Sequence, residues 1–367
     1  MIKLSKPWIP EQAFADVKTV LESGNLVQGV YAKRFEDDAA VYLGVRHAIA
    51  VSSATAALHL SVMALGIGPG DEVIVPAFTF PATANVVEVA GASVKLVDIR
   101  SEDCCINEAL IERHISPKTK AIIPVHEFGQ SALSDVIAAI AQHNGLDVID
   151  DAACAFGAVF NKKKTGTFGR IGCFSLHPRK AITTGEGGFV VTDDDGIADK
   201  VRSLRNHGIV SHDGKIDFVY AGLNYRMTDF QAALGCAQLY HANELTSYRR
   251  RIAAVYSQEL SKHPGIVVPK EYIDRVHVYQ TYHVLLPDSV DRDAIIVRLK
   301  DQGIETNYGA YALNALTYYK QKYGYIETDC PEAYRAYKHG LALPMGNHVT
   351  EDDAKLVAAT LIKMIGG

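Results

Sequence analysis

The chain has 367 residues, of which 48% are hydrophobic and 22% are charged, a composition typical of an ordinary globular protein with a large core and two domains. Its net charge of −5 and the lack of a long lysine or arginine block argue against nucleic acid or an anionic membrane as a partner. No apolar run is long enough to cross a bilayer, and the N-terminal stretch M-I-K-L-S-K-P-W-I-P lacks the apolar core of a signal peptide. We therefore expect a cytoplasmic location.

From about residue 45 to 200, short apolar runs alternate with helical patterns. The runs predict buried strands of a parallel sheet at residues 47–51, 72–76, 93–98, 120–125 and 146–151. Helices are predicted at residues 54–65 and 133–142, with Gly66 and Gly145 suited to C-terminal caps. This alternation predicts a doubly wound α/β domain, in which ligands bind beyond the carboxyl ends of the strands.

The C-terminal third has a different pattern. A polar helix is predicted at residues 243–263 and a short strand near residues 283–286, followed by further helical segments. We expect a large α/β domain over residues 1–245 and a smaller α+β domain over residues 246–367.

Lys180 lies in a turn between two apolar runs, residues 172–176 and 188–192. The runs are too close for a crossover helix, so we expect them to pair antiparallel. A lysine amine beside a strand end can form a Schiff base with an aldehyde cofactor, although a loop lysine is more often a solvated charge. Asp151 ends another apolar strand, and of the pair Asp150 and Asp151 only one side chain can face a given side of the sheet. A lysine for an aldehyde and a carboxylate for a pyridine nitrogen together suggest a pyridoxal phosphate site.

Other polar and aromatic residues follow the predicted strands. Ser53, Ala54 and Thr55 open a helix whose free amides and dipole attract a phosphate, although Ser53 equally suits a simple N-cap. Phe80 lies past another strand end and can stack on a cofactor ring or pack in the core. Ser175, on the strand before the lysine, can add a hydroxyl to the phosphate.

The sequence contains no complete motif for binding a metal ion or a dinucleotide. His126-Glu127 begins an H-E-x-x-H zinc motif, but Gln130 stands in place of the second histidine. The six cysteines form no C-x-x-C pair and are expected to be reduced, mostly buried thiols, so no metal site is expected. No G-x-G-x-x-G lies between a strand and its helix, which disfavours a dinucleotide-dependent dehydrogenase.

Nearly the whole chain resembles the DegT/StrS-type sugar aminotransferases, a branch of the fold-type I pyridoxal phosphate enzymes. The matching motifs include S-S-A-T-A-A-L-H-L, G-D-E-V-I-V-P-A-F-T-F, V-I-D-D-A-A, G-C-F-S-L-H-P-R-K-A-I-T-T-G-E-G-G and L-N-Y-R-M-T-D-F-Q-A-A-L-G. The resemblance implies a large domain with a mostly parallel mixed sheet and a smaller C-terminal α+β domain. It also implies pyridoxal 5'-phosphate as the cofactor, with pyridoxamine 5'-phosphate formed in the half-reaction.

The resemblance assigns roles around the cofactor ring. It implies that Lys180 is the Schiff-base lysine, that Asp151 partners the pyridine nitrogen and that Phe80 covers the ring. Cys154 departs from the family pattern, which usually has Gln, Glu or His near the phenolic oxygen of the cofactor, and a thiol is a weaker hydrogen-bond partner. Ser131 is a second departure, since proline is common there. Lys180 argues against the related dehydratases, which carry histidine in its place.

The resemblance also assigns the phosphate site and a partner. Ala54, Thr55 and Ser175 match the phosphate cradle. Asn224 matches an asparagine that family members donate to the cofactor phosphate of the neighbouring subunit. A homodimer with shared active sites is therefore implied.

The implied reaction moves an amino group from L-glutamate to a nucleotide-linked ketosugar, in the biosynthesis of an amino sugar for a surface polysaccharide, glycan or natural product. The run N-Y-R-M-T-D-F-Q-A-A-L-G-C-A-Q-L looks more like enzymes acting at C4 of a 4-keto-6-deoxy sugar than those acting at C3. A cyclitol or 3-keto sugar aminotransferase is the nearest alternative. A non-catalytic regulatory or binding protein on the same scaffold is a remote one, because both Lys180 and Asp151 are present.

Overall fold

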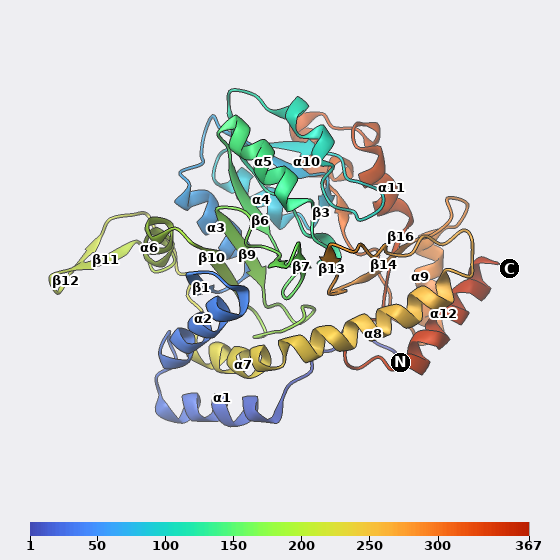
Figure 1. The fold of residues 1–367 in the computed structure, drawn as a ribbon, viewed down its shortest axis with the longest axis horizontal. Coiled ribbons are helices and arrows are strands. Elements are labelled where there is room, and N and C mark those ends of the chain that lie inside the picture. The colour runs from blue at the N-terminus through green and yellow to red at the C-terminus, as the bar shows by residue number, and fades with distance from the viewer. Residues whose placement is uncertain (367) are drawn as a thin grey trace.

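A seven-stranded sheet forms the centre of the computed structural model, which describes residues 1–366 (Figure 1). Across the sheet the strands are β1 (His47–Val51), β10 (Gly188–Thr192), β9 (Ile171–Ser175), β6 (Asp147–Asp151), β5 (Thr119–Ile122), β2 (Glu72–Pro76) and β4 (Ser93–Val97). All pairs from β9 to β4 are parallel, whereas β10 is antiparallel to both of its neighbours. The expected α/β fold with a mostly parallel mixed sheet is confirmed.

The sheet differs from the prediction at one edge. Residues 47–51 were expected to lie among parallel neighbours, but β1 pairs only with β10, and antiparallel, with Ile49 opposite Val190. The connection between β9 and β10 is too short for a crossover helix, so β10 turns back beside β9 and β1 joins beyond it. The predicted antiparallel pairing around Lys180 is confirmed, with Gly188 opposite Ser175.

Helices cover both faces of the sheet in the first 240 residues. They are α1 (Glu11–Ser23), α2 (Val30–Leu43), α3 (Ala54–Ala64), α4 (Ala82–Val89), α5 (Ser134–Asn144), α6 (Asp195–Leu204) and α7 (Asp229–Tyr240). Ile49 and Val51 of β1 join one buried cluster while Ala48 and Ala50 join another, as the alternation of side chains along a strand requires. Gly145 caps α5 with a φ of 66°, as predicted.

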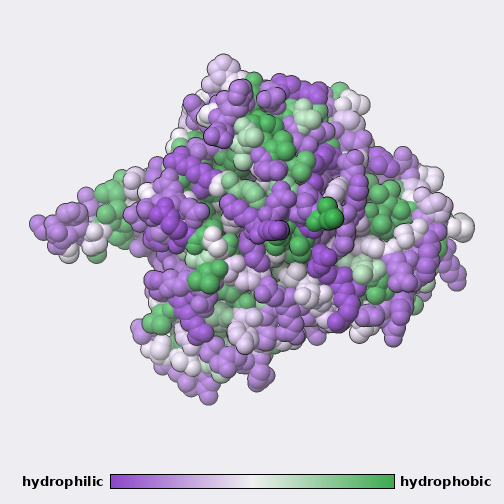
Figure 2. Space-filling view, in the orientation of Figure 1, coloured by the Kyte–Doolittle hydropathy of each residue, from purple (hydrophilic) through white to green (hydrophobic). Residues whose placement is uncertain are grey.

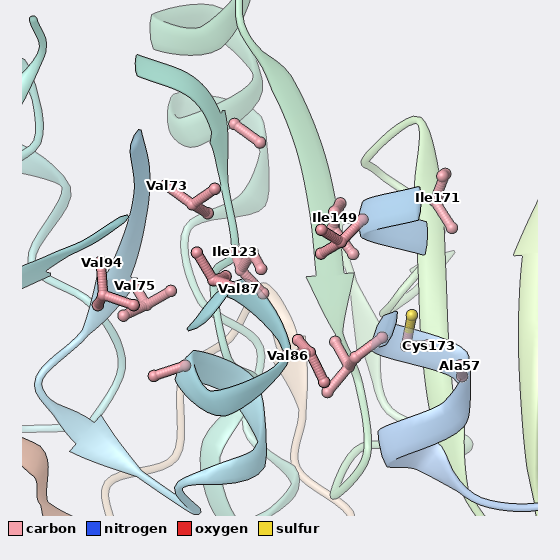
Figure 3. Packing of buried hydrophobic residues seen from close by; sticks show 14 of the residues in the cluster. Ala57, Val73, Val75, Val86, Val87, Val94, Ile123, Ile149, Ile171 and Cys173 are labelled. Carbon is pink, nitrogen blue, oxygen red and sulfur yellow. The ribbon is translucent and has the colours of Figure 1, made fainter. Parts of the chain in front are cut away.

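The largest core cluster lies between the sheet and the helices α3 and α4 (Figure 3). Val73 and Val75 of β2 and Ile149 of β6 point into it, and Val86 and Val87 of α4 pack against them. Because these side chains are fully or almost fully buried, they hold α3 and α4 firmly against one face of the sheet.

The C-terminal part carries α8 (Ala242–Leu260), α9 (Arg292–Asp301), α10 (Thr317–Tyr323), α11 (Pro331–His339), α12 (Glu351–Ile365) and the antiparallel pair β14 (Tyr282–Leu285) and β16 (Gly340–Leu343). The helix expected at 243–263 and the strand expected near 283–286 are thus present. Helix α8 continues without a break past residue 245, and Ile2 bridges to Ile304. The division into domains at residue 245 stays a prediction.

Short elements complete the described chain. The strands are β3 (Phe78–Thr79), β7 (Val159–Phe160), β8 (Lys163–Lys164), β11 (Ile209–His212), β12 (Lys215–Phe218), β13 (Arg275–Val276) and β15 (Tyr311–Ala312). Single 3-10 turns span Glu108–Leu110, Glu112–His114, Glu127–Gly129, Leu313–Ala315 and Glu327–Asp329. The hairpin of β11 and β12 projects away from the rest of the molecule (Figure 1). Within residues 1–366, no helix is long and apolar enough to span a bilayer.

Candidate active site

A cavity of about 710 Å³ lies beyond the carboxyl ends of β6 and β9, where the first turn of α3 and the C-terminal part meet. Most of the residues expected to form a site line this cavity: Ser53, Ala54, Thr55, Phe80, Asp151, Cys154, Ser175 and Lys180. Segments from the C-terminal part, including Gln280 and Asn307, close the other side. Its volume lies in the range of small-molecule binding sites.

Lys180 reaches the cavity from the turn between β9 and β10. Its main-chain N–H donates to the carbonyl oxygen of His177 at 2.8 Å, which closes the turn. The Nζ atom donates to Sγ of Cys154 at 3.1 Å. Burial raises the pKa of the Cys154 thiol to about 11, so the thiol is uncharged at neutral pH and forms no ion pair with the lysine. The main-chain oxygen of Lys180 accepts from Nη2 of the buried Arg249 at 3.3 Å.

Asp151 ends β6 and is almost fully buried at the floor of the cavity. Its carboxyl accepts from Oγ1 of Thr83 at 2.7 Å and from the N–H of Ala153 at 3.1 Å. Burial nevertheless raises the pKa of this carboxyl above its ordinary value, with the Thr83 and Ala153 hydrogen bonds and the charge of Lys180 opposing. A desolvated carboxyl of this kind is stabilised as an anion by a positively charged N–H partner, such as the ring nitrogen of pyridoxal phosphate would supply.

Asp150 faces the opposite side of β6. Its carboxyl contacts Nε2 of His126 at 3.2 Å and accepts from the N–H groups of Phe168 and Gly169 at 2.9 and 2.7 Å. Only Asp151 of the acidic pair lines the cavity, as the alternation of side chains along a strand predicts.

The first turn of α3 forms one end of the cavity. Oγ of Ser53 accepts from the N–H of Ala56 at 3.0 Å, so the capping interpretation of Ser53 is confirmed. The amides of Ala54 and Thr55 belong to the first turn, where a helix has no internal acceptor for them, and both residues line the cavity. A Cβ at Gly188 would lie 2.9 Å from the Ala54 nitrogen, so the absence of a side chain lets β10 approach this turn. The geometry fits a bound phosphate group.

Phe80 stands at the mouth of the cavity with 65% of its surface exposed. Its ring centroid lies 6.2 Å from that of Tyr311, at an angle of 64°. Phe78, two residues earlier, is the one that packs into the core. The core-packing interpretation of Phe80 was therefore wrong, and the side chain is free to lie over a ligand ring. Ser175 is buried at the end of β9 and also lines the cavity.

Asn224 does not line the cavity of its own chain. It is exposed and bridges to Asn206, in a segment that runs beside the end of β1. Arg226, the other polar residue of this motif, donates from Nη1 to Oδ1 of Asn206. The role of Asn224 in a neighbouring subunit stays a prediction.

Sequence reasoning missed several residues of the cavity. Thr83 contacts Asp151, and its hydroxyl follows Phe80 by three residues, a spacing that places both near the start of α4. Arg179 directly precedes Lys180 and lines the cavity. Glu127, considered only as part of a failed zinc motif, is a buried lining residue. No group of three or more residues suited to hold a metal ion occurs in the described part of the chain, and all its cysteines are free, with only Cys154 not fully buried.

The fold is that of the fold-type I pyridoxal phosphate transferases, and a lysine amine, a buried carboxylate and a helix N-terminus around one cavity fit that cofactor. The model of the DegT/DnrJ/EryC1/StrS aminotransferase family matches residues 7–362, and the chain belongs to this family. It is a sugar aminotransferase that uses pyridoxal phosphate and its pyridoxamine form.

Similar proteins span almost the whole chain. The spore coat polysaccharide biosynthesis protein SpsC of Bacillus subtilis is 36% identical, over 99% of this chain and 97% of its own length. GDP-perosamine synthase of Caulobacter vibrioides is 40% identical, over 92% of this chain and 91% of its own. Among solved structures, a putative sugar aminotransferase from Streptococcus pneumoniae in its pyridoxamine phosphate form has a TM-score of 0.95 at 26% identity, covering 100% of this chain and 99% of that one.

Proposed function

We propose that the enzyme transfers the amino group of L-glutamate to the C4 keto group of a nucleotide-linked 4-keto-6-deoxy sugar. The observation that carries this proposal is that Lys180, Asp151 and the first turn of α3 line the same cavity. The regiochemistry rests on the run at residues 224–239, which resembles that of C4 enzymes. The similarity to a GDP-perosamine synthase and to a polysaccharide biosynthesis protein supports a nucleotide sugar as acceptor.

Bound pyridoxal phosphate supplies an electron sink for the bond broken at the substrate carbon. Lys180 would hold the cofactor, and its amine, once freed, would take the proton from the α-carbon of glutamate. Asp151 would hold the ring nitrogen of the cofactor. In the second half-reaction the same residues act in reverse on the keto carbon of the sugar, so that one amino group leaves glutamate and one arrives on the sugar.

The substrates of this reaction are both anionic, since glutamate carries two carboxylates and a nucleotide sugar carries a diphosphate. Arg179 supplies a guanidinium to the cavity lining, whereas the Lys180 side chain is assigned to the cofactor. The backbone of Arg179 is held by Nε2 of Gln280, which donates to its carbonyl oxygen at 3.1 Å. We assign to the Arg179 guanidinium the binding of a substrate carboxylate or phosphate at the mouth of the cavity.

A homodimer with shared active sites belongs to the proposal. On the projecting hairpin, Ile216 and Phe218 are 68% and 64% exposed, and Figure 2 shows its apolar surface behind a hydrophilic tip. Exposed apolar groups on a projecting arm favour burial against another chain. Asn224 lies just beyond this hairpin and outside its own cavity, which fits a role in the cavity of a second copy.

The visible absorption spectrum of the protein loaded with pyridoxal phosphate tests the proposal. We expect a yellow band that bleaches on addition of L-glutamate and that is lost or altered in Lys180→Ala. Candidate keto substrates are then ranked by how fast each restores the colour. Faster recovery with a 4-keto nucleotide sugar than with a 3-keto sugar or a keto-cyclitol supports the proposal, and the reverse order overturns it in favour of those alternatives. A protein that stays colourless with the cofactor supports the non-catalytic binding protein.

A further inference from the structure

Glu127 is held in a rigid turn at one wall of the active-site cavity. The turn is unusual because Phe128 has a φ of 55° and Gly129 a φ of 99°. The Phe128 ring stacks on His283 with centroids 4.4 Å apart, and a Cβ at Gly129 would lie 2.7 Å from the Val278 side chain. The backbone on the C-terminal side of Glu127 is therefore packed too closely to shift.

The Glu127 side chain is only 4% exposed and separates two spaces. One is the active-site cavity, and the other is a recess of about 40 Å³ behind it. The charged and titratable residues that line the active-site cavity with Glu127 are Asp151, Cys154, His177, Arg179, Lys180 and Glu186, and of these Asp151 and Lys180 act on its charge. Those on the side of the recess are Glu102, Asp103, Cys104, Cys105, Lys270, His277 and His283.

Burial keeps two thiols and two histidines among these neighbours uncharged near neutral pH. Burial raises the pKa of Cys104 and Cys154, and it lowers the pKa of His277 and His283 to about 3, so these groups are uncharged. Burial raises the pKa of Glu127 itself to about 8, with the charge of Lys180 opposing and that of Asp151 adding to the shift. The Glu127 carboxyl is thus mostly protonated at pH 7 and becomes an anion above about pH 8.

We propose that Glu127 is a positioning residue that stabilises the protonated state of the Lys180 nitrogen at alkaline pH, when that nitrogen is bonded to the cofactor. An anion in a desolvated wall favours a nearby positive charge, whereas the protonated carboxyl does not. In the loaded enzyme, the Lys180 nitrogen therefore keeps its proton up to a higher pH than it would without Glu127. This inference rests on the proposed function, because it requires the bond between Lys180 and the cofactor.

The test is a pH titration of the visible band of the cofactor-loaded protein, without substrate, from about pH 6 to 10. E127Q mimics the protonated carboxyl. Its spectrum should match that of the unsubstituted protein near pH 7, and its colour transition should fall about one pH unit lower. E127D keeps a carboxyl on a shorter side chain and should give a smaller shift in the same direction. E102Q makes the same chemical change at an exposed residue of the recess and should leave the transition in place.

The outcomes separate the two proposals. Yellow protein whose transition is the same with and without E127Q overturns the role of Glu127 and leaves the proposed function standing. A protein that never turns yellow with pyridoxal phosphate overturns both. Circular dichroism checks that each variant is folded. If E127Q does not fold, the titration of E127D is compared with that of the unsubstituted protein. An unshifted transition in E127D then contradicts the proposal.

Discussion

Replacing Thr83 by valine keeps the shape of the side chain and removes its hydrogen bond to Asp151. That bond is 2.7 Å long and its acceptor is an almost fully buried carboxyl. Hydrogen bonds to charged groups contribute about 1.5–3 kcal/mol, and about 1.4 kcal/mol corresponds to a factor of ten. If the whole bond acts in the rate-limiting proton transfer, Thr83→Val should slow the bleaching by glutamate about 10- to 100-fold.

The pH dependence of stability gives a second readout of the same change. The pKa of Asp151 is raised by burial and lowered by Thr83, so the valine variant should raise it further. For an acid whose pKa is raised on folding, the ionised form costs stability, and this cost is present above the folded pKa and vanishes below the unfolded one. The cofactor-free variant should therefore be less stable than the unsubstituted protein at neutral pH, and the difference in free energy of unfolding should shrink as the pH falls.

Single-turnover bleaching and urea unfolding at two pH values measure these effects. Thr83→Ser keeps the hydroxyl and is the matched control, with a bleaching rate expected to stay close to that of the unsubstituted protein. If the valine variant bleaches within about twofold of the serine variant, the hydrogen bond from Thr83 to Asp151 does not contribute to catalysis, which refutes the prediction.

Three other changes test separate features. Arg179→Ala should raise the apparent KM for glutamate or for the nucleotide sugar about tenfold or more, with Arg179→Lys intermediate, and the two half-reactions measured separately tell which anion it binds. Gly188→Ala places a Cβ 2.5 Å from the Phe174 oxygen and should lower the free energy of unfolding by about 1–3 kcal/mol, measured in urea. Gly68→Ala is the control and should lower it less, because the nearest atom to its Cβ lies at 3.6 Å. Equal losses would contradict the close packing of the backbone at Gly188. The double substitution Ile216→Asp and Phe218→Asp should shift the protein from dimer to monomer in analytical ultracentrifugation. A dimer that persists places the interface elsewhere.

Local patterns in the sequence determined the elements of this fold. Apolar runs of strand length predicted β2, β4, β5 and β6, because a strand buried on both faces needs a continuous apolar run. The short connection around Lys180 predicted the antiparallel return of β10, since chain length alone excludes a crossover helix. Ser53 as an N-cap and Gly145 as a C-cap followed from the same kind of near-neighbour chemistry.

The pairing order of the sheet did not follow from such patterns. Which strand lies beside which depends on contacts between distant segments, so β1 was expected among parallel strands and lies beyond β10 instead. For the same reason the exposed position of Phe80 was not decided by its sequence neighbours, since a strand end can turn either into the core or toward a cavity.

The sequence by itself indicated Lys180 and Asp151 as the candidate reactive pair, because each stands in a motif read within a few residues. Only the tertiary structure decided their surroundings. Thr83 reaches Asp151 because the first turn of α4 lies beside the carboxyl end of β6. Glu127 is desolvated because a turn buries it between two spaces. Burial and charge depend on which segments meet in space, and this long-range packing sets the chemistry of the site.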